Sequence, residues 1–308
     1  MSKKSEKSGK SRHTKPDKYR SFRLQKGIRH PVRLPGVRSI TAEAARTLWR
    51  YRGLFLGITL IYGLLNLVLA QGLAGGADVS SLKESLGKVF SGHLGFLPTS
   101  LGVFVLMLGS AGNTTNQTAG TYQSILVIIA SLAVIWTLRQ VLSGSLPRIR
   151  DAYYQGMYPL VPFILVLAVV GLQLMPMVLG STLYVTVVNS GIAVYAVEKI
   201  LWALLFVVLA LLSLYMLTSS LFALYIVTLP DMTPMKALRS ARELVRYRRW
   251  TVLRKILWLP VVLMAAALLI MLPVIILVPP LAKWLFFLLT MAVLTAAHTY
   301  MYTLYREL

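Results

Sequence analysis

The stretch that decides the fold is Ile256–Leu304, which reads ILWLPVVLMAAALLIMLPVIILVPPLAKWLFFLLTMAVLTAAHTYMYTL. It holds two apolar runs, 256–278 and 281–304, separated only by Pro279 and Pro280. A helix of about 18 or more apolar residues is long enough to cross about 30 Å of hydrocarbon. Because the connection is so short, the two runs are predicted to form a tight antiparallel hairpin of membrane-spanning helices.

Four more runs of this kind precede the hairpin: Gly53–Leu73, Thr121–Leu138, Pro159–Leu179 and Ile200–Leu229. The chain of 308 residues is 56% hydrophobic and 14% charged, with a mean hydropathy of +0.68. A soluble domain has about 45–50% apolar and about 25% charged residues. The sequence therefore predicts an all-α integral membrane protein with about six transmembrane helices.

The positive charge is unevenly distributed along the chain. Of the 32 Lys and Arg residues, 16 lie between Lys3 and Arg52. With six spans and an internal N-terminus, 28 of the 32 fall on the cytoplasmic side and four on the outside. Cytoplasmic loops of membrane proteins are enriched in Lys and Arg, so this orientation is favoured. We therefore expect a multi-pass protein of the cytoplasmic (plasma) membrane with both termini in the cytoplasm.

One further apolar segment, Gly92–Gly109, is interrupted by Pro98 and several glycines. As a seventh span it would divide the cations into 18 inside and 14 outside. That weak bias argues against a seventh span. The segment is expected to be re-entrant or interfacial, within the first outer loop.

Residues 1–38 form a basic tail without apolar periodicity, which is expected to be disordered, and 39–308 form the polytopic membrane domain. A tether to anionic lipids is the favoured role of the tail, because each cation near the surface contributes about 1 kcal/mol. A purely topogenic role explains the charge equally well. Binding of nucleic acid or ribosome is less favoured, because Tyr19 and Phe22 are the only nearby aromatic residues for base stacking.

A basic octet recurs before two of the apolar runs. Residues 45–52 read ARTLWRYR and residues 241–248 read ARELVRYR, with six identical positions at an offset of 196. A weaker candidate, Pro147–Tyr158, precedes the third run. The pattern suggests three units, each an elbow helix followed by two spans, at 39–142, 143–230 and 231–308. Common descent and the interface's general preference for basic amphipathic residues both explain it.

The second octet lies on a predicted amphipathic helix, with Thr233 as N-cap and Pro234 at the first helical position. Such a helix can lie in the membrane interface with its apolar side down and its cations among lipid phosphates. The predicted apolar side consists of Met235, Leu238, Ala241 and Val245. The predicted lipid-phosphate contacts are Lys236, Arg239, Arg246 and Arg249.

The stretch Met235–Trp258, which contains KALRSARELVRYRRWTVLRK and leads into the apolar hairpin, resembles multi-spanning bacterial membrane proteins of uncharacterised function. It is also similar to the elbow in the membrane domain attached to some bacterial glycerophosphodiester phosphodiesterases. The resemblance covers roughly the C-terminal third of the chain. In that family catalysis belongs to a separate soluble barrel domain, so the resemblance implies a membrane fold and assigns no catalytic residue.

Residues that could carry chemistry are few. The sequence contains no cysteine and no Walker loop, HExxH or GxSxG motif, so we expect no enzyme activity, no metal and no cofactor. Ionisable and polar residues in membrane helices are functional candidates by default. The candidates are Glu198, Lys199, His298, Gln173 and Asn66.

Each candidate also has a structural interpretation. Glu198 and Lys199 lie near the predicted outer interface, where they stay hydrated, and His298 and the amides more often hydrogen-bond a neighbouring helix. The sequence favours a non-enzymatic envelope scaffold or assembly partner, acting with other proteins or as a homo-oligomer. A small-solute or lipid transporter built from hairpin repeats is the alternative, and it requires the polar residues to converge near the midplane. An enzyme acting on lipid ranks third.

Overall fold

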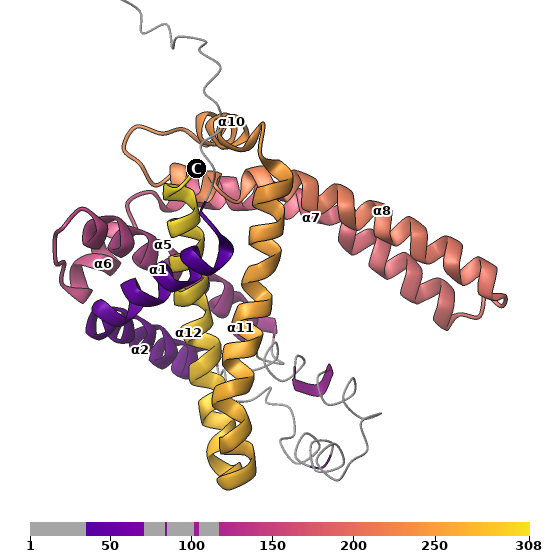
Figure 1. Ribbon diagram of the computed structural model, residues 1–308, viewed down its shortest axis with the longest axis horizontal. Helices are drawn as coiled ribbons and strands as arrows, with labels where there is room; N and C mark the ends of the chain where they lie inside the picture. The colour runs from indigo at the N-terminus through magenta and orange to yellow at the C-terminus, as the bar shows by residue number, and fades with distance from the viewer. Residues whose placement is uncertain (1–34, 71–83, 85–101, 105–116) are drawn as a thin grey trace, which may run out of the picture. The chain divides into compact units, whose positions relative to one another are not determined.

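The computed structural model describes residues 35–70, 84, 102–104 and 117–308. The chain divides into two units, Met1–Leu34 and Pro35–Leu308, and the second unit holds every described residue. Within these ranges each regular element is a helix (Figure 1). The basic tail up to Leu34 lies outside the described residues, so its expected disorder stays a prediction.

Six helices of the described residues are long and apolar enough to cross a membrane, which confirms the predicted membrane fold. A short helix, α9 (Ala223–Ile226), continues α8 after a turn. The predicted C-terminal hairpin forms, with α11 and α12 side by side (Figure 1). The six spans are α2 (Arg52–Leu69), α5 (Gln117–Leu142), α7 (Leu160–Asn189), α8 (Ala196–Ser220), α11 (Arg249–Leu277) and α12 (Pro279–Arg306).

The third span is longer than predicted. The polar residues after Leu179 predict an end there, whereas α7 continues to Asn189. Ser181 and Thr182 remain helical, and their hydroxyls donate to the carbonyl oxygen of Val178 at 2.8 and 2.9 Å. Gly180 faces α8, where an added Cβ would lie 3.1 Å from a Leu209 methyl carbon. Internal hydrogen bonds and close packing against α8 thus extend the helix.

Three short helices each precede a pair of spans: α1 (Val37–Arg50), α6 (Ile149–Gly156) and α10 (Pro234–Val245). This order fits the arrangement of the three predicted units, whose common origin stays a prediction. α1 begins at Val37, inside the segment expected to be tail, and buries Ile40 and Ala44.

The two octets share a helix break. α1 passes into α2 with a break at Tyr51, and α10 passes into α11 with a break at 246–248. An arginine lies over the next tyrosine ring in both breaks, at 5.5 Å from the ring centroid: Arg50 over Tyr51, and Arg246 over Tyr247. The repeated R-Y-R sequence therefore lies at a helix break in both octets, although the break is one residue long in the first and three residues long in the second.

The octets do not share a buried face. Val245 is fully buried, whereas the equivalent Trp49 is 73% exposed. Likewise, Ala241 is buried and the equivalent Ala45 is exposed. The matched sequences thus pack through different sides of their helices.

α10 packs on the protein through small side chains. Ala237, Ala241 and Val245 are fully buried, and the helix contacts α8 and α9. The predicted apolar side is wrong at Met235, which is 74% exposed. The alanines lie one turn apart, so their short side chains let α10 approach its neighbours along this stripe instead. Thr233 is the N-cap residue as predicted, although its hydroxyl makes no capping hydrogen bond.

Hydrogen bonds join helix ends that the charge pattern assigns to the inside. Arg139 of α5 donates from Nη1 to the carbonyl oxygen of Thr228, after α9, at 2.8 Å. Lys255, buried near the start of α11, donates to the carbonyl oxygen of Pro35, just before α1. These bonds bring together the end of α5 and the end of α9, and the start of α11 and the start of α1. Which side faces the cytoplasm stays a prediction.

α5 is the helix most enclosed by its neighbours. Every residue of 130–138 is buried, so this stretch is covered on all sides. Phe55 and Ile58 of α2 pack on this stretch of α5. Phe287 and Met291 of α12 form a second cluster with residues of α2 and α5.

Only residues 102–104 of the segment expected to be re-entrant or interfacial are described, and they are helical. Phe104 is buried, and its ring centroid lies 5.5 Å from that of Phe286 in α12. It belongs to a hydrophobic cluster that also includes Met271 of α11. The rest of Gly92–Gly109 lies outside the described residues, so its membrane placement stays a prediction.

Candidate functional site

Glu198 caps the start of α8. Its Oε2 accepts the backbone N–H groups of Val194 at 2.9 Å and Tyr195 at 3.2 Å. The first N–H groups of a helix lack partners within the helix, and an acidic side chain there also suits the helix dipole. Lys199 is exposed. These contacts give Glu198 a structural role, which is the interpretation favoured from the sequence.

His298 hydrogen-bonds a neighbouring helix, as its structural interpretation predicted. Its Nδ1 lies 3.0 Å from the hydroxyl oxygen of Tyr225 in α9. The Tyr225 ring also meets the rings of Tyr302 and Tyr305, with centroids 6.0 and 6.2 Å away. This aromatic cluster packs α9, which follows α8, against the last turns of α12.

Among the described residues, buried amide atoms of Asn66 and Gln173 lack hydrogen-bond partners. Asn66 in α2 is 0% exposed, and neither its amide nitrogen nor its oxygen has a hydrogen-bond partner among the described residues. The Oε1 of Gln173 in α7 is buried and lacks a partner in the same part of the chain. Asn66 follows Tyr62 on the side of α2 that packs with α5 and α12, whereas Gln173 lies in the α7–α8 pair. The five candidates are therefore distributed over several places in the fold.

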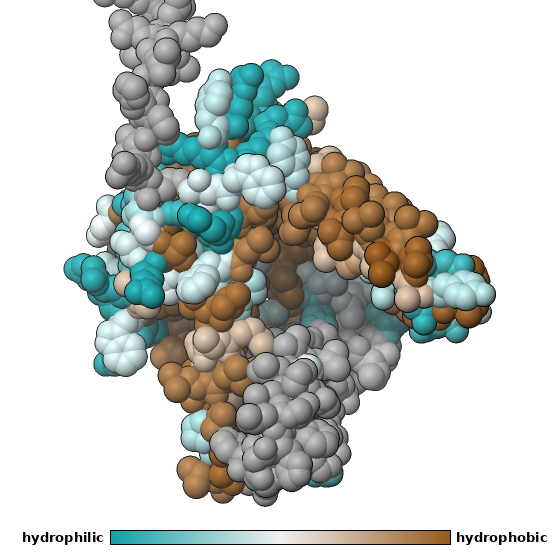
Figure 2. All heavy atoms as spheres, turned by 45° about the vertical axis from the view of Figure 1, so that its right-hand side comes forward, coloured by the Kyte–Doolittle hydropathy of each residue, from teal (hydrophilic) through white to brown (hydrophobic). Residues whose placement is uncertain are grey.

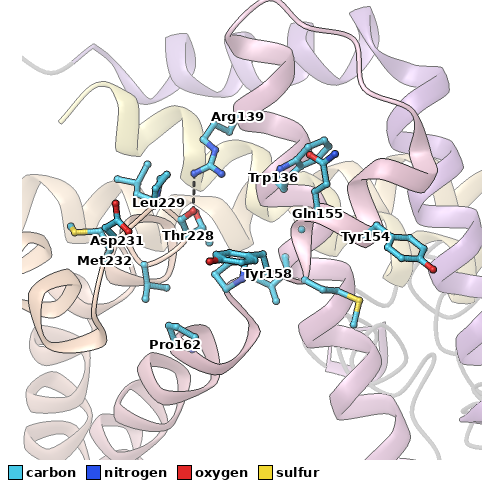
Figure 3. Close-up of a pocket in the computed structure, with 16 residues that line it drawn as sticks. Trp136, Arg139, Tyr154, Gln155, Tyr158, Pro162, Thr228, Leu229, Asp231 and Met232 are labelled. Atoms are coloured by element: carbon cyan, nitrogen blue, oxygen red, sulfur yellow. Dashed lines mark hydrogen bonds between the residues drawn. The ribbon is translucent and has the colours of Figure 1, made fainter.

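A pocket of about 850 Å³ opens where α5, α6 and α7 meet the 227–232 segment (Figure 3). Its walls combine apolar, aromatic and charged side chains. The charged residues are Arg139 and Asp231, and Trp136 and Tyr158 are among the aromatic residues. A volume of this size is in the range of small-molecule sites, about 300–1,000 Å³.

Glycine at position 156 lets α6 approach α5 closely enough to form one wall. A Cβ added to Gly156 would lie 3.1 Å from the Cα of Ala133 and 3.2 Å from the carbonyl oxygen of Leu132. These are backbone atoms that cannot rotate away. The contact fixes where the chain leaves α6, and so places Tyr158 at the rim of the pocket.

A tyrosine holds the other side of α6. The Tyr153 hydroxyl donates to the carbonyl oxygen of Ile58 in α2 at 2.9 Å. Burial raises the pKa of the Tyr153 phenol, and the nearby Tyr62 phenol adds to the rise. The group therefore stays protonated and able to donate. α6 is thus anchored to α2 and α5 at once.

Arg139 is positioned by its bond to Thr228. One guanidinium N–H donates to the Thr228 carbonyl oxygen, and Figure 3 shows the side chain directed to it. A guanidinium has five N–H groups, so donors remain for a ligand. Asp231 follows in the same segment with a φ of 58°, a left-handed conformation that Asp tolerates better than most residues. No ion pair joins Arg139 and Asp231 in the described part of the chain, although both line the pocket.

The pocket was not predicted from the sequence. In the sequence, Arg139 is only one of the predicted cytoplasmic charges. Residues that line the pocket with it, such as Asp231, are distant from it in the chain. The available signal is local: Trp136 and Arg139 lie one helical turn apart at the end of a span, a placement typical of the membrane interface.

The fold and the pocket define a helical, multi-pass membrane protein with an amphipathic site at one end of its spans. The chain matches no protein-family model, no curated protein and no solved structure. The resemblance to the membrane domain of glycerophosphodiester phosphodiesterases therefore stays a prediction.

Proposed function

We propose that this protein is a non-enzymatic scaffold or assembly partner of the cytoplasmic membrane, with both termini in the cytoplasm. The observation that supports this best is the character of the α7–α8 hairpin. Only 6% of the most hydrophobic stretch of α8 is buried within the chain, the smallest share among the six spans, against 17% for α11 and 22% for α7. The two helices pack mainly on each other, so most of their apolar surface is available to lipid or to another membrane protein.

Within the hairpin, α8 turns its polar groups inward, whereas Thr182 and Thr186 of α7 are exposed. The buried residues of α8 are Ser213, Thr218, Ser219 and Ser220, whereas its leucines and valines are largely exposed. Ser213 Oγ accepts the N–H of Met177, which follows Pro176 in α7. Figure 2 shows apolar surface along the hairpin. Lipid tails are as apolar as leucine, so this face fits lipid as well as a partner helix, and a partner would have to gain from close packing.

Photo-crosslinking in native membranes tests the scaffold role. A photo-crosslinking phenylalanine analogue at Val208 of α8, which is exposed, should give discrete adducts with protein. The matched control is the same analogue at Leu269 of α11, which is also exposed and apolar. We expect protein adducts mainly from position 208. Adducts with lipid alone from both positions would contradict an assembly role for the hairpin.

The transporter alternative rests on the Asn66 amide and the Gln173 Oε1, which lack partners among the described residues. A buried amide without a partner costs about 1–3 kcal/mol, so such a group is retained most readily where water or a solute reaches it. Asn66→Leu and Gln173→Leu separate the two functions. The scaffold account expects unchanged crosslinking and a stability equal to or above that of the parent chain. Loss of a cellular phenotype at normal abundance and with unchanged crosslinking would favour transport.

A further inference from the structure

We propose that the pocket beside Arg139 binds the headgroup of a zwitterionic phospholipid, with the phosphate at Arg139 and the ammonium group at Asp231. This inference does not depend on the scaffold role, because it concerns the ligand of one pocket and not the partner of the hairpin.

Arg139 provides the phosphate subsite. Its guanidinium is partly buried, and its bond to the Thr228 carbonyl oxygen holds it at the pocket wall. No other hydrogen bond of Arg139 is present in the described residues, so its remaining donors can meet phosphate oxygens. Arginine matches phosphate with two parallel N–H···O bonds, which gives both strength and orientation.

Asp231 makes a purely anionic ligand a poor fit. The carboxylate is exposed and lines the same pocket without a hydrogen bond or ion pair among the described residues. It would repel an anionic headgroup and attract a cation. Trp136 and Tyr158 line the pocket as well, and aromatic faces stabilise ammonium groups by cation–π contact. An arginine, an acid and aromatic rings together fit a ligand with a phosphate and an ammonium group, as in phosphoethanolamine.

The surroundings favour a lipid over a soluble molecule. Leu132 of α5 and Pro162 of α7 line the pocket, and both residues lie within membrane-spanning helices. The apolar wall of the pocket therefore extends from the helix ends toward the membrane core. Met157 and Leu229 add further apolar surface near the opening. With the headgroup at Arg139, the glycerol and acyl chains of the lipid would lie along this apolar wall. A soluble ligand would find few polar partners there.

Native mass spectrometry of the full-length protein tests the site. The protein is released from nanodiscs of equal phosphatidylethanolamine and phosphatidylglycerol, and the retained lipid is counted. The parent chain should retain phosphatidylethanolamine in preference. Arg139→Gln should lower retention of both lipids by about tenfold, because a charge-assisted phosphate contact is lost. Arg148→Gln is the control, since Arg148 is exposed and does not line the pocket.

Asp231→Asn tests the ammonium subsite without disturbing the fold, because Asn also tolerates a positive φ. It should lower the ratio of phosphatidylethanolamine to phosphatidylglycerol at least severalfold while total lipid retention stays high. An unchanged ratio would overturn the zwitterionic assignment. If Arg139→Gln fails to fold, Arg139→Lys keeps the charge without the paired donors and should reduce retention less.

Free phosphoethanolamine separates the two sources of the same headgroup. We expect it to displace retained lipid only weakly, because it lacks the glycerol and acyl chains that would lie on the apolar wall. Displacement at the same concentration as short-chain phosphatidylethanolamine would show a soluble ligand and overturn the lipid assignment. If Arg139→Gln retains as much of each lipid as the parent chain does, the assignment of this pocket as a lipid site is wrong.

Discussion

Helices α5 and α8 have similar hydropathy and opposite packing. The most hydrophobic windows of the two helices have mean hydropathies of 2.2 and 2.7, yet 61% of the first is buried within the chain and 6% of the second. α5 buries leucine, isoleucine and valine on all sides, whereas α8 buries hydroxyl residues and exposes its aliphatic ones. In a bilayer both arrangements keep apolar atoms out of water. Hydropathy therefore identifies a span but does not say whether the span faces protein or lipid.

The largest expected effect comes from matched leucines in the two helices. Leu138 of α5 is 0% exposed and Leu204 of α8 is 59% exposed. Leu138→Ala should leave a cavity and lower the free energy of unfolding by about 2–5 kcal/mol. Leu204→Ala should change it by less than about 0.5 kcal/mol. Unfolding by steric trapping in bicelles measures both. Similar losses would mean that α8 is enclosed by a partner in the sample.

The approach of α6 to α5 gives the next largest effect. Gly156→Ala places a Cβ against backbone atoms of α5 and should cost about 1–3 kcal/mol of stability. Gly171→Ala in α7 is the control, because nothing lies within 4 Å of its added Cβ. That change should stabilise the protein by up to about 1 kcal/mol, since Ala favours helix more than Gly. Thermal unfolding in detergent distinguishes the two. Equal shifts in the same direction would contradict the close contact.

The polar contact inside the hairpin should contribute less. Ser213→Ala removes the acceptor of the Met177 N–H and should cost roughly 0.6–1.7 kcal/mol, the range of interhelical hydrogen bonds in membranes. Ser181→Ala removes only a bond to its own helix and should be close to neutral. Hydrogen exchange of α7 reports the difference, with faster exchange near Met177 expected in Ser213→Ala alone. Unchanged hydrogen exchange near Met177 in Ser213→Ala would contradict a stabilising role for this hydrogen bond.

The cations of the α10–α11 elbow give the smallest expected effect on the fold. Lys236, Arg239 and Arg246 are exposed, while Arg249 lies 4.5 Å from the Tyr215 ring centroid. Replacing all four with Gln should weaken attraction to anionic lipid but leave α10 docked, because its alanine stripe packs on α8 and α9. Spin-label mobility along α10 measures this. Ala241→Leu is the contrasting variant and should mobilise the helix even in anionic bilayers. Greater mobility in the four-Gln variant than in Ala241→Leu would show that charge holds the elbow.

The spans were predictable because each is a long apolar run, and a bilayer imposes that length on any helix that crosses it. The extension of α7 past Leu179 was not, because Ser181 and Thr182 look like loop residues until their hydroxyls bond the helix backbone. The side of α10 that packs was predicted correctly at Ala241 and Val245 but wrongly at Met235, since periodicity marks an apolar stripe without showing what covers it.

The candidate site depended on contacts that no local pattern contains. Glu198 and His298 could be assigned structural roles from their types and places in the spans, and their contacts agree. The pocket could not be assigned, because Arg139, Tyr158 and Asp231 come from separate elements, which the close approach at Gly156 and the Arg139–Thr228 bond help to bring together.

Single-cysteine labelling tests the six-span arrangement most directly, because the sequence contains no cysteine. Ser143 follows α5 and Ser190 follows α7, and both are exposed. The charge pattern places the first inside and the second outside. An impermeant maleimide should label Ser190→Cys in intact cells and Ser143→Cys only after the membrane is opened. Labelling of Ser143→Cys in intact cells, with Ser190→Cys protected, would contradict the orientation, and equal labelling of both would contradict the crossing of α7.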